Sequence, residues 1–79
     1  MPWYAYVWPD EIIEHLAEHD ITPEDFEYVL ANSQVVGKSD SSGRDAVWGY
    51  TPDGRFVIAV YELVDNVTVI PVTCYEVPE

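Results

Sequence analysis

Two histidines on one predicted helix are the residues of this chain best suited to chemistry. His15 and His19 are four residues apart and flank Glu18, in the order His-x-x-Glu-His that some zinc hydrolases use. Residues four apart lie on one face of a helix, so both imidazoles could reach one ion while Glu18 acted as a base. A zinc site also needs a third protein ligand, and the remaining donors, Cys74 and the carboxylates, are scattered along the chain. We therefore predict no metal and no other cofactor, and interpret the segment as a helix with two histidines beside its buried stripe.

The other candidate catalytic groups carry less information. Cys74 lies near Val72 in an apolar stretch with no positive residue beside it, which is typical of a buried, inert thiol. Fifteen Asp and Glu offer many carboxylate pairs, so none stands out as an acid–base couple. The chain has no glycine-rich phosphate loop. Since Cys74 is the only cysteine, no disulfide can form within the chain, and we expect a cytoplasmic protein.

The charge is strongly negative. Fifteen acidic residues and only Lys38, Arg44 and Arg55 give a formal charge of −12, and residues 1–37 contain no Lys or Arg. Such a surface repels phosphate backbones and argues against nucleic-acid binding. It favours either a self-repelling soluble surface or a face for a basic protein partner. Arg44 and Arg55 both follow turn residues, where they could form ion pairs within the fold or hold an anion such as a phosphate.

The N-terminal third predicts a strand and a helix. Residues 2–8 are aromatic and β-branched, which suits a strand with apolar side chains on both faces. We expect such a strand to be sandwiched between layers or to form an interface. A first helix is expected over Pro9–His19, with Pro9 at the first helical position. The side chains expected to point away from its buried stripe include Glu11, Glu14 and Glu18.

A tight corner then joins this helix to a second one, expected over Pro23–Ala31. Thr22 is a good N-cap, and Asp25, three residues later, completes a capping box. Ile21 before the cap and Phe26 after it can close as a hydrophobic staple.

The remaining chain alternates apolar and polar residues and predicts four strands. They are expected at Gln34–Ser39, Arg44–Thr51, Arg55–Val64 and Val67–Val77. Arg55–Val64 is apolar on both faces and should be central, while Pro71 places the last strand at an edge or in a bulge. We predict one α+β domain over residues 1–79: an N-terminal strand, a two-helix hairpin covering one sheet face, and a four-stranded antiparallel meander. No signal peptide or membrane span is expected.

This order of elements resembles the BrnT-like branch of the RelE-type toxins, small ribonucleases of bacterial type II toxin–antitoxin pairs. The matching residues are Trp8, Asp10, His19-Asp20-Ile21, Thr22–Phe26, Arg44, Trp48-Gly49, Gly54–Tyr61 and Val67–Thr73. The resemblance implies a RelE/BrnT-like fold, an antitoxin-like protein partner, and RNA cleavage by His19, Arg44 and Arg55. The chain departs from the family at Glu18, which replaces a basic residue, and at Thr68 and Thr73, which replace arginines of the last strand.

Two hypotheses follow. The first is a toxin-like protein of a type II toxin–antitoxin pair with ribonuclease activity. The second is a non-catalytic module on the same fold that holds a protein partner or a second copy of itself. The residues expected to make that contact are Trp3, Tyr4 and Tyr6 of the aromatic strand and Glu11, Glu14 and Glu18 of the first helix.

Overall fold

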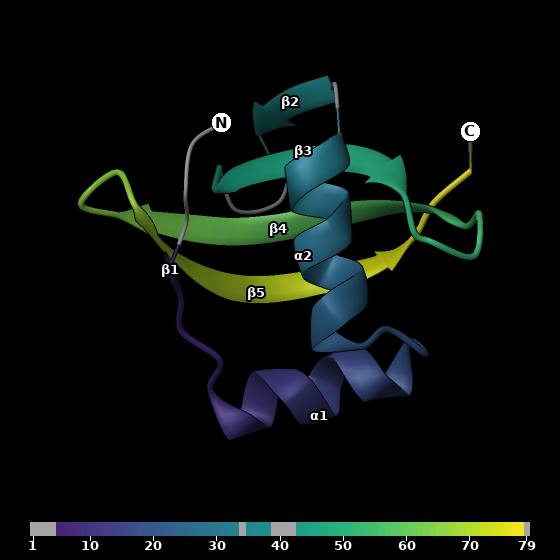
Figure 1. Ribbon diagram of the computed structural model, residues 1–79, viewed down its shortest axis with the longest axis horizontal. Helices are drawn as coiled ribbons and strands as arrows, with labels where there is room; N and C mark the ends of the chain where they lie inside the picture. Colours follow the sequence, from purple (N-terminus) through teal and green to yellow (C-terminus); the bar gives the residue numbers. More distant parts are fainter. Residues whose placement is uncertain (1–4, 34, 39–42, 79) are drawn as a thin grey trace.

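The computed structural model, which describes residues 5–33, 35–38 and 43–78, places two helices beside a five-stranded sheet (Figure 1). The predicted α+β class is confirmed. In chain order the elements are β1 (Ala5–Tyr6), α1 (Asp10–Glu18), α2 (Pro23–Asn32), β2 (Val35–Lys38), β3 (Asp45–Tyr50), β4 (Phe56–Val64) and β5 (Thr68–Glu76). Neither helix of this described part is long and apolar enough to cross a membrane.

The sheet is mixed, with strand order β1-β5-β4-β3-β2. Strands β2 to β5 pair antiparallel with their neighbours in sequence, whereas β1 pairs parallel with β5 through Ala5–Thr68 and Tyr6–Val69. The described sheet is therefore not a simple meander, because the N-terminal strand extends it. Strand β4 lies in the middle, which confirms the prediction made from its two apolar faces.

Pro71 marks a bulge in β5. Val60 pairs with Thr73 and Tyr61 pairs with Pro71, so Val72 is an extra residue on the β5 side. A bulge suits a proline because its nitrogen cannot donate to the ladder. Of the two predicted alternatives, the bulge is correct. β5 is not the outermost strand of the sheet, because β1 pairs with Thr68 and Val69, but this pairing does not extend to Pro71.

Helix α1 begins one residue later than predicted. Pro9 has an extended backbone (φ −62°, ψ 140°), so it is the N-cap rather than the first helical residue. The helix ends at Glu18, and His19 is its C-cap. Asp20 then takes the left-handed conformation (φ 60°) that commonly terminates helices and turns the chain toward α2.

The corner between the helices has the predicted capping box. The Thr22 nitrogen donates to Asp25 Oδ2 over 3.2 Å, and the Asp25 nitrogen donates to Thr22 Oγ1 over 3.1 Å. Ile21 and Phe26, the predicted staple residues, are both buried in the same core. Helix α2 continues to Asn32, one residue beyond the predicted end.

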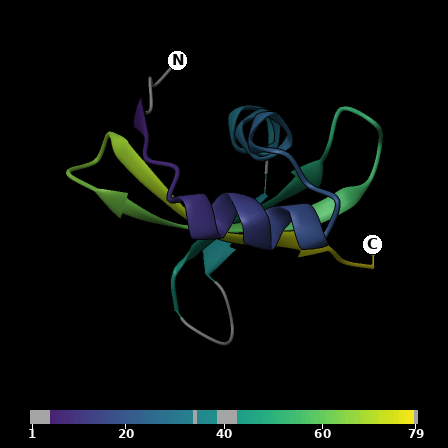
Figure 2. The same cartoon turned by 90° about the horizontal axis from the view of Figure 1, so that it is seen from below.

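The helices occupy different positions on the sheet. Helix α2 lies over β3 and β4, whereas α1 runs along the β5 side (Figures 1 and 2). Both helices contribute to one core on the same face, as expected, but α1 lies along β5 and does not cover the middle of the sheet. Gly49 allows α2 to approach closely, because a Cβ atom at that position would lie 3.1 Å from Cβ of Ser33. The buried residues between the helices and the sheet are Leu16, Ile21, Phe26, Val29, Val47, Val57, Ala59, Val69 and Cys74.

The opposite face of the sheet carries a second, smaller cluster. Ala46, Ile58 and Val60 are buried there, and Trp48 and Val72 pack against them. Helix α2 lies on the other side of the sheet (Figure 2), and α1 borders this side at β5, where His15 contacts Thr73.

Candidate functional site

The two histidines meet the end of β5. The His15 and His19 ring centroids are 5.2 Å apart, and the His19 and Tyr75 centroids are 6.1 Å apart. His15 Nε2 lies 2.9 Å from Thr73 Oγ1, so this hydroxyl and the imidazole share a hydrogen bond. The four-residue spacing of His15 in α1 and His19 at its C-cap puts both rings beside β5 and brings two imidazoles and a phenol together.

Glu18 lies beside His15 at this end of the molecule. Its carboxylate is 3.9 Å from His15 Nδ1, and both side chains are substantially exposed. No group of three or more His, Cys, Asp or Glu within the described ranges could hold a metal ion.

Arg55 is held by acidic residues at the start of β4. Its Nε donates to Asp53 Oδ2 over 3.0 Å, and its Nη2 lies 3.7 Å from Asp25 Oδ2. Burial alone would lower the pKa of Arg55, but the carboxylates of Asp53, Asp20 and Asp25 raise it. Since Asp20 follows His19 directly, Arg55 and His19 are at the same end of the sheet.

The turn before β4 fixes the direction of this guanidinium. The Thr51 hydroxyl donates to Asp53, and this bond, together with Arg55, holds the pKa of Asp53 below its usual 3.8. The Arg55 nitrogen donates in return to Thr51 Oγ1 over 3.0 Å. Thr51 is buried, and the Arg55 side chain is bound to Asp53 of its own turn.

Arg44 lies at the opposite end of the sheet. Its Nε donates to Glu62 Oε1 over 2.8 Å. Strands β3 and β4 pair from Asp45–Tyr61 to Tyr50–Phe56, a length of roughly 17 Å at the usual strand rise. The structure thus brings His19 and Arg55 to one end and separates Arg44 from both.

No family model, curated protein or solved structure matches this chain.

The predicted partner-binding residues fall into three groups. Trp3 and Tyr4 lie outside the described residues. Tyr6 is half-buried against the main core, so its side chain is used within the fold. The third group, Glu11, Glu14 and Glu18, is exposed on α1.

Glu27 and Cys74 both have structural roles within the fold. Glu27 Oε2 accepts a hydrogen bond from Trp8 Nε1 over 2.9 Å, which ties α2 to the segment before α1. Burial raises the pKa of Cys74 to about 12, and the Asp25 carboxylate adds to this effect. The predicted burial of this thiol is confirmed.

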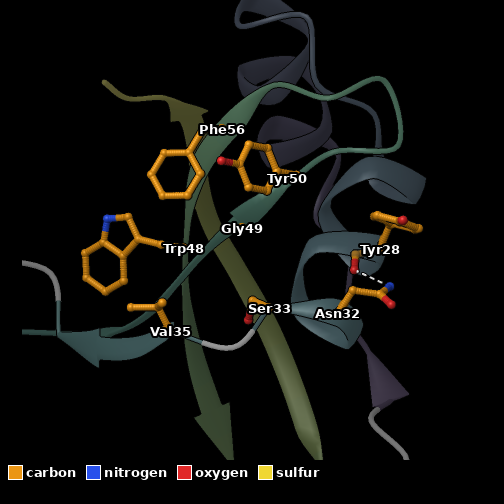
Figure 3. Close-up of a pocket in the computed structure, with 8 residues that line it drawn as sticks. All are labelled: Tyr28, Asn32, Ser33, Val35, Trp48, Gly49, Tyr50 and Phe56. Carbon is orange, nitrogen blue, oxygen red and sulfur yellow. Dashed lines mark hydrogen bonds between the residues drawn. The ribbon is translucent and has the colours of Figure 1, made fainter. Parts of the chain in front are cut away.

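A hollow between the end of α2 and β3 was not predicted from the sequence. It has a volume of about 380 Å³, with Tyr28 and Asn32 on the α2 side and Trp48, Tyr50 and Phe56 on the sheet side (Figure 3). Alternation along the strand predicts that Trp48 and Tyr50 share a face. It cannot predict that the end of α2 stops beside Gly49.

Proposed function

We propose that this chain is a non-catalytic protein-binding module that holds a basic protein partner on the exposed side of α1. One observation carries the proposal: all three Lys and Arg residues are engaged by carboxylates within the fold. Lys38 pairs with Asp45, and the two arginines are bound as described above. An RNA-cleaving site needs positive groups directed at the phosphate, and here those groups face acids of the same chain.

The exposed side of α1 is acidic. Glu11, Glu14 and Glu18 are all exposed, and no Lys or Arg occurs anywhere in residues 1–37. A surface of one sign attracts partners of the other sign over about a Debye length and sets the rate of encounter. The best match is therefore a basic helix or loop of another protein.

The proposal is tested with two variants of equal charge. Glu11→Gln/Glu14→Gln/Glu18→Gln neutralises α1, while Glu62→Gln/Asp65→Asn/Glu76→Gln neutralises three acids of the strands and their turn. Fluorescence anisotropy with a labelled arginine-rich helical peptide reports the affinity of each variant. We expect about a tenfold loss for the α1 variant, which corresponds to about 1.4 kcal/mol, and at most about a twofold loss for the control. Equal losses would show that only net charge matters and would overturn the assignment to α1.

A second candidate function is the toxin-like ribonuclease of a type II toxin–antitoxin pair, on a fold like that of the BrnT-like toxins. The grouping of His15, His19 and Tyr75 favours it, because imidazole and phenol groups can transfer protons during RNA cleavage. Its test is expression in bacterial cells. Slower growth with the wild-type chain and normal growth with His19→Ala would support it. Identical growth in both strains would contradict it.

A further inference from the structure

The hollow between the end of α2 and β3 has aromatic side chains on both of its sides. Trp48, Tyr50 and Phe56 lie on the sheet side, and Tyr28 lies on the α2 side (Figure 3). The Tyr50 and Phe56 ring centroids are 5.1 Å apart and the rings are inclined by 55°, so they are not stacked face to face. Tyr28 is 44% exposed and Tyr50 is 48% exposed, so a ligand can reach both rings from solvent. The volume of about 380 Å³ is enough for a whole small molecule.

The residues described as lining the hollow include no charged side chain. Besides the aromatic residues they are Asn32, Ser33, Val35 and Gly49. An anion would therefore meet no positive group there, and the three Lys and Arg residues are paired with carboxylates elsewhere. A primary ammonium or a guanidinium group would meet no carboxylate for its strong donors, and unpaired donors are costly to bury. These walls suit either a neutral apolar group or a cation that has no N–H donors.

Three features favour the cation over the neutral group. The faces of aromatic rings are negative and attract cations, and a Trp ring does so most strongly. The hollow lies beside the C-terminal end of α2, where the helix dipole is negative, and the last turn of this helix carries no basic residue. Glu24 is exposed one turn before Tyr28 on the same side of α2, and the whole chain has a charge of −12. A quaternary ammonium group combines positive charge with a methyl surface and has no donor to satisfy, so it matches the hollow.

We propose that this hollow binds a small quaternary ammonium compound, with the cationic head between the aromatic residues of α2 and those of the sheet. Asn32 lies at the α2 side of the hollow, where its Nδ2 donates to the Tyr28 carbonyl oxygen over 2.9 Å (Figure 3). This bond holds the amide in place, and Asn32 Oδ1 can accept a hydrogen bond from a hydroxyl group of the ligand. The site is formed by α2 and the sheet, so it does not depend on the binding of a basic partner to α1.

The first test compares two ligands of the same shape on the wild-type protein. Choline is the charged probe, and the neohexyl alcohol in which carbon replaces its nitrogen is the neutral one. NMR titration of isotope-labelled protein measures both affinities and locates the site through the signals of the Trp48 indole and the Gly49 amide. We expect a Kd of roughly 1 mM for choline and binding at least about ten times weaker for the neutral alcohol. Equal affinities would show that the hollow recognises only apolar surface and would overturn the proposal. A trimethyllysine peptide that binds at least about ten times more tightly than choline would overturn the assignment to a small compound.

The second test changes the two most accessible rings. Tyr28→Leu/Tyr50→Leu removes both rings and keeps apolar side chains, whereas Tyr28→Phe/Tyr50→Phe keeps the rings and removes only the hydroxyl groups. Both positions are about half exposed, so both variants are expected to fold, which circular dichroism verifies. We expect the leucine variant to bind choline about 5–30 times more weakly than the wild type, and the phenylalanine variant to bind within about twofold of it.

Unchanged choline binding by the leucine variant would show that net charge alone attracts the cation and would overturn the proposal. The α1 variant Glu11→Gln/Glu14→Gln/Glu18→Gln should lose affinity for the arginine-rich peptide but bind choline within about twofold of the wild type. The two proposals therefore fail separately.

Discussion

Replacing Arg55 by glutamine should destabilise the protein far more than replacing Arg44. The Arg55 and Asp25 side chains are only 23% and 20% exposed, whereas those of Arg44 and Glu62 are 42% and 50% exposed. Exposed ion pairs contribute up to about 1 kcal/mol, and breaking a buried pair costs about 3–5 kcal/mol. We place Arg55→Gln between these limits, at about 1.5 kcal/mol, and Arg44→Gln below about 0.5 kcal/mol. For a domain of this size the first value lowers Tm by about 6–12 °C.

The pH dependence of the free energy of unfolding provides a second measure of the Arg55 contacts. Thr51 and Arg55 hold the folded-state pKa of Asp53 below 3.8. A carboxyl group with a lowered folded-state pKa stabilises the fold above its unfolded-state pKa, and this stabilisation is lost as pH falls through the folded-state value. The difference in the free energy of unfolding between wild type and Arg55→Gln should therefore be constant near neutral pH. It should become smaller as the pH falls below 3.8. Urea unfolding followed by tryptophan fluorescence at pH 7 and pH 3 measures both values. Equal stabilities of Arg55→Gln and Arg44→Gln at pH 7 would refute a structural role for the Arg55 contacts.

Three further changes test other parts of the structure. Thr22→Ala removes the side-chain acceptor of the capping box and should cost about 1 kcal/mol in urea unfolding, whereas Thr22→Ser should cost much less. Trp8→Phe leaves Glu27 without its indole donor and should cost about 1–3 kcal/mol; the double variant Trp8→Phe/Glu27→Leu should recover part of this loss, and no recovery would contradict the bond. Cys74, with its pKa raised to about 12 by burial, should react with an aromatic disulfide reagent at pH 8 at least about 100 times more slowly in the native protein than in urea. A rapid native reaction would contradict its burial.

Local sequence patterns predicted most of the fold. Thr22 and Asp25 are three residues apart, so the capping box is visible without any tertiary information. The apolar residues on both faces of Arg55–Val64 likewise identified the central strand. The position of β1 was not predictable, since its parallel pairing with β5 joins residues more than sixty positions apart. The position of α1 also depends on that pairing and on the length of β5 left uncovered.

The candidate site was predicted less completely, for a related reason. Sequence order places Arg44 and Arg55 near adjacent turns, but antiparallel pairing sends them to opposite ends of β3 and β4. The spacing of His15 and His19 did predict that their rings lie together. It could not show that Tyr75 and Thr73 complete this group, because the bulge at Pro71 changes the register of the strand that carries them.

A single-turnover RNA cleavage assay distinguishes a non-catalytic binding module from a ribonuclease. The wild-type chain, in excess over end-labelled messenger RNA and ribosome-bound RNA, is compared with His19→Ala and with Arg55→Gln. If the chain is a non-catalytic binding module, wild type and both variants will give the same band pattern as RNA incubated without protein. Cleavage by the wild type that is lost in His19→Ala would contradict this conclusion.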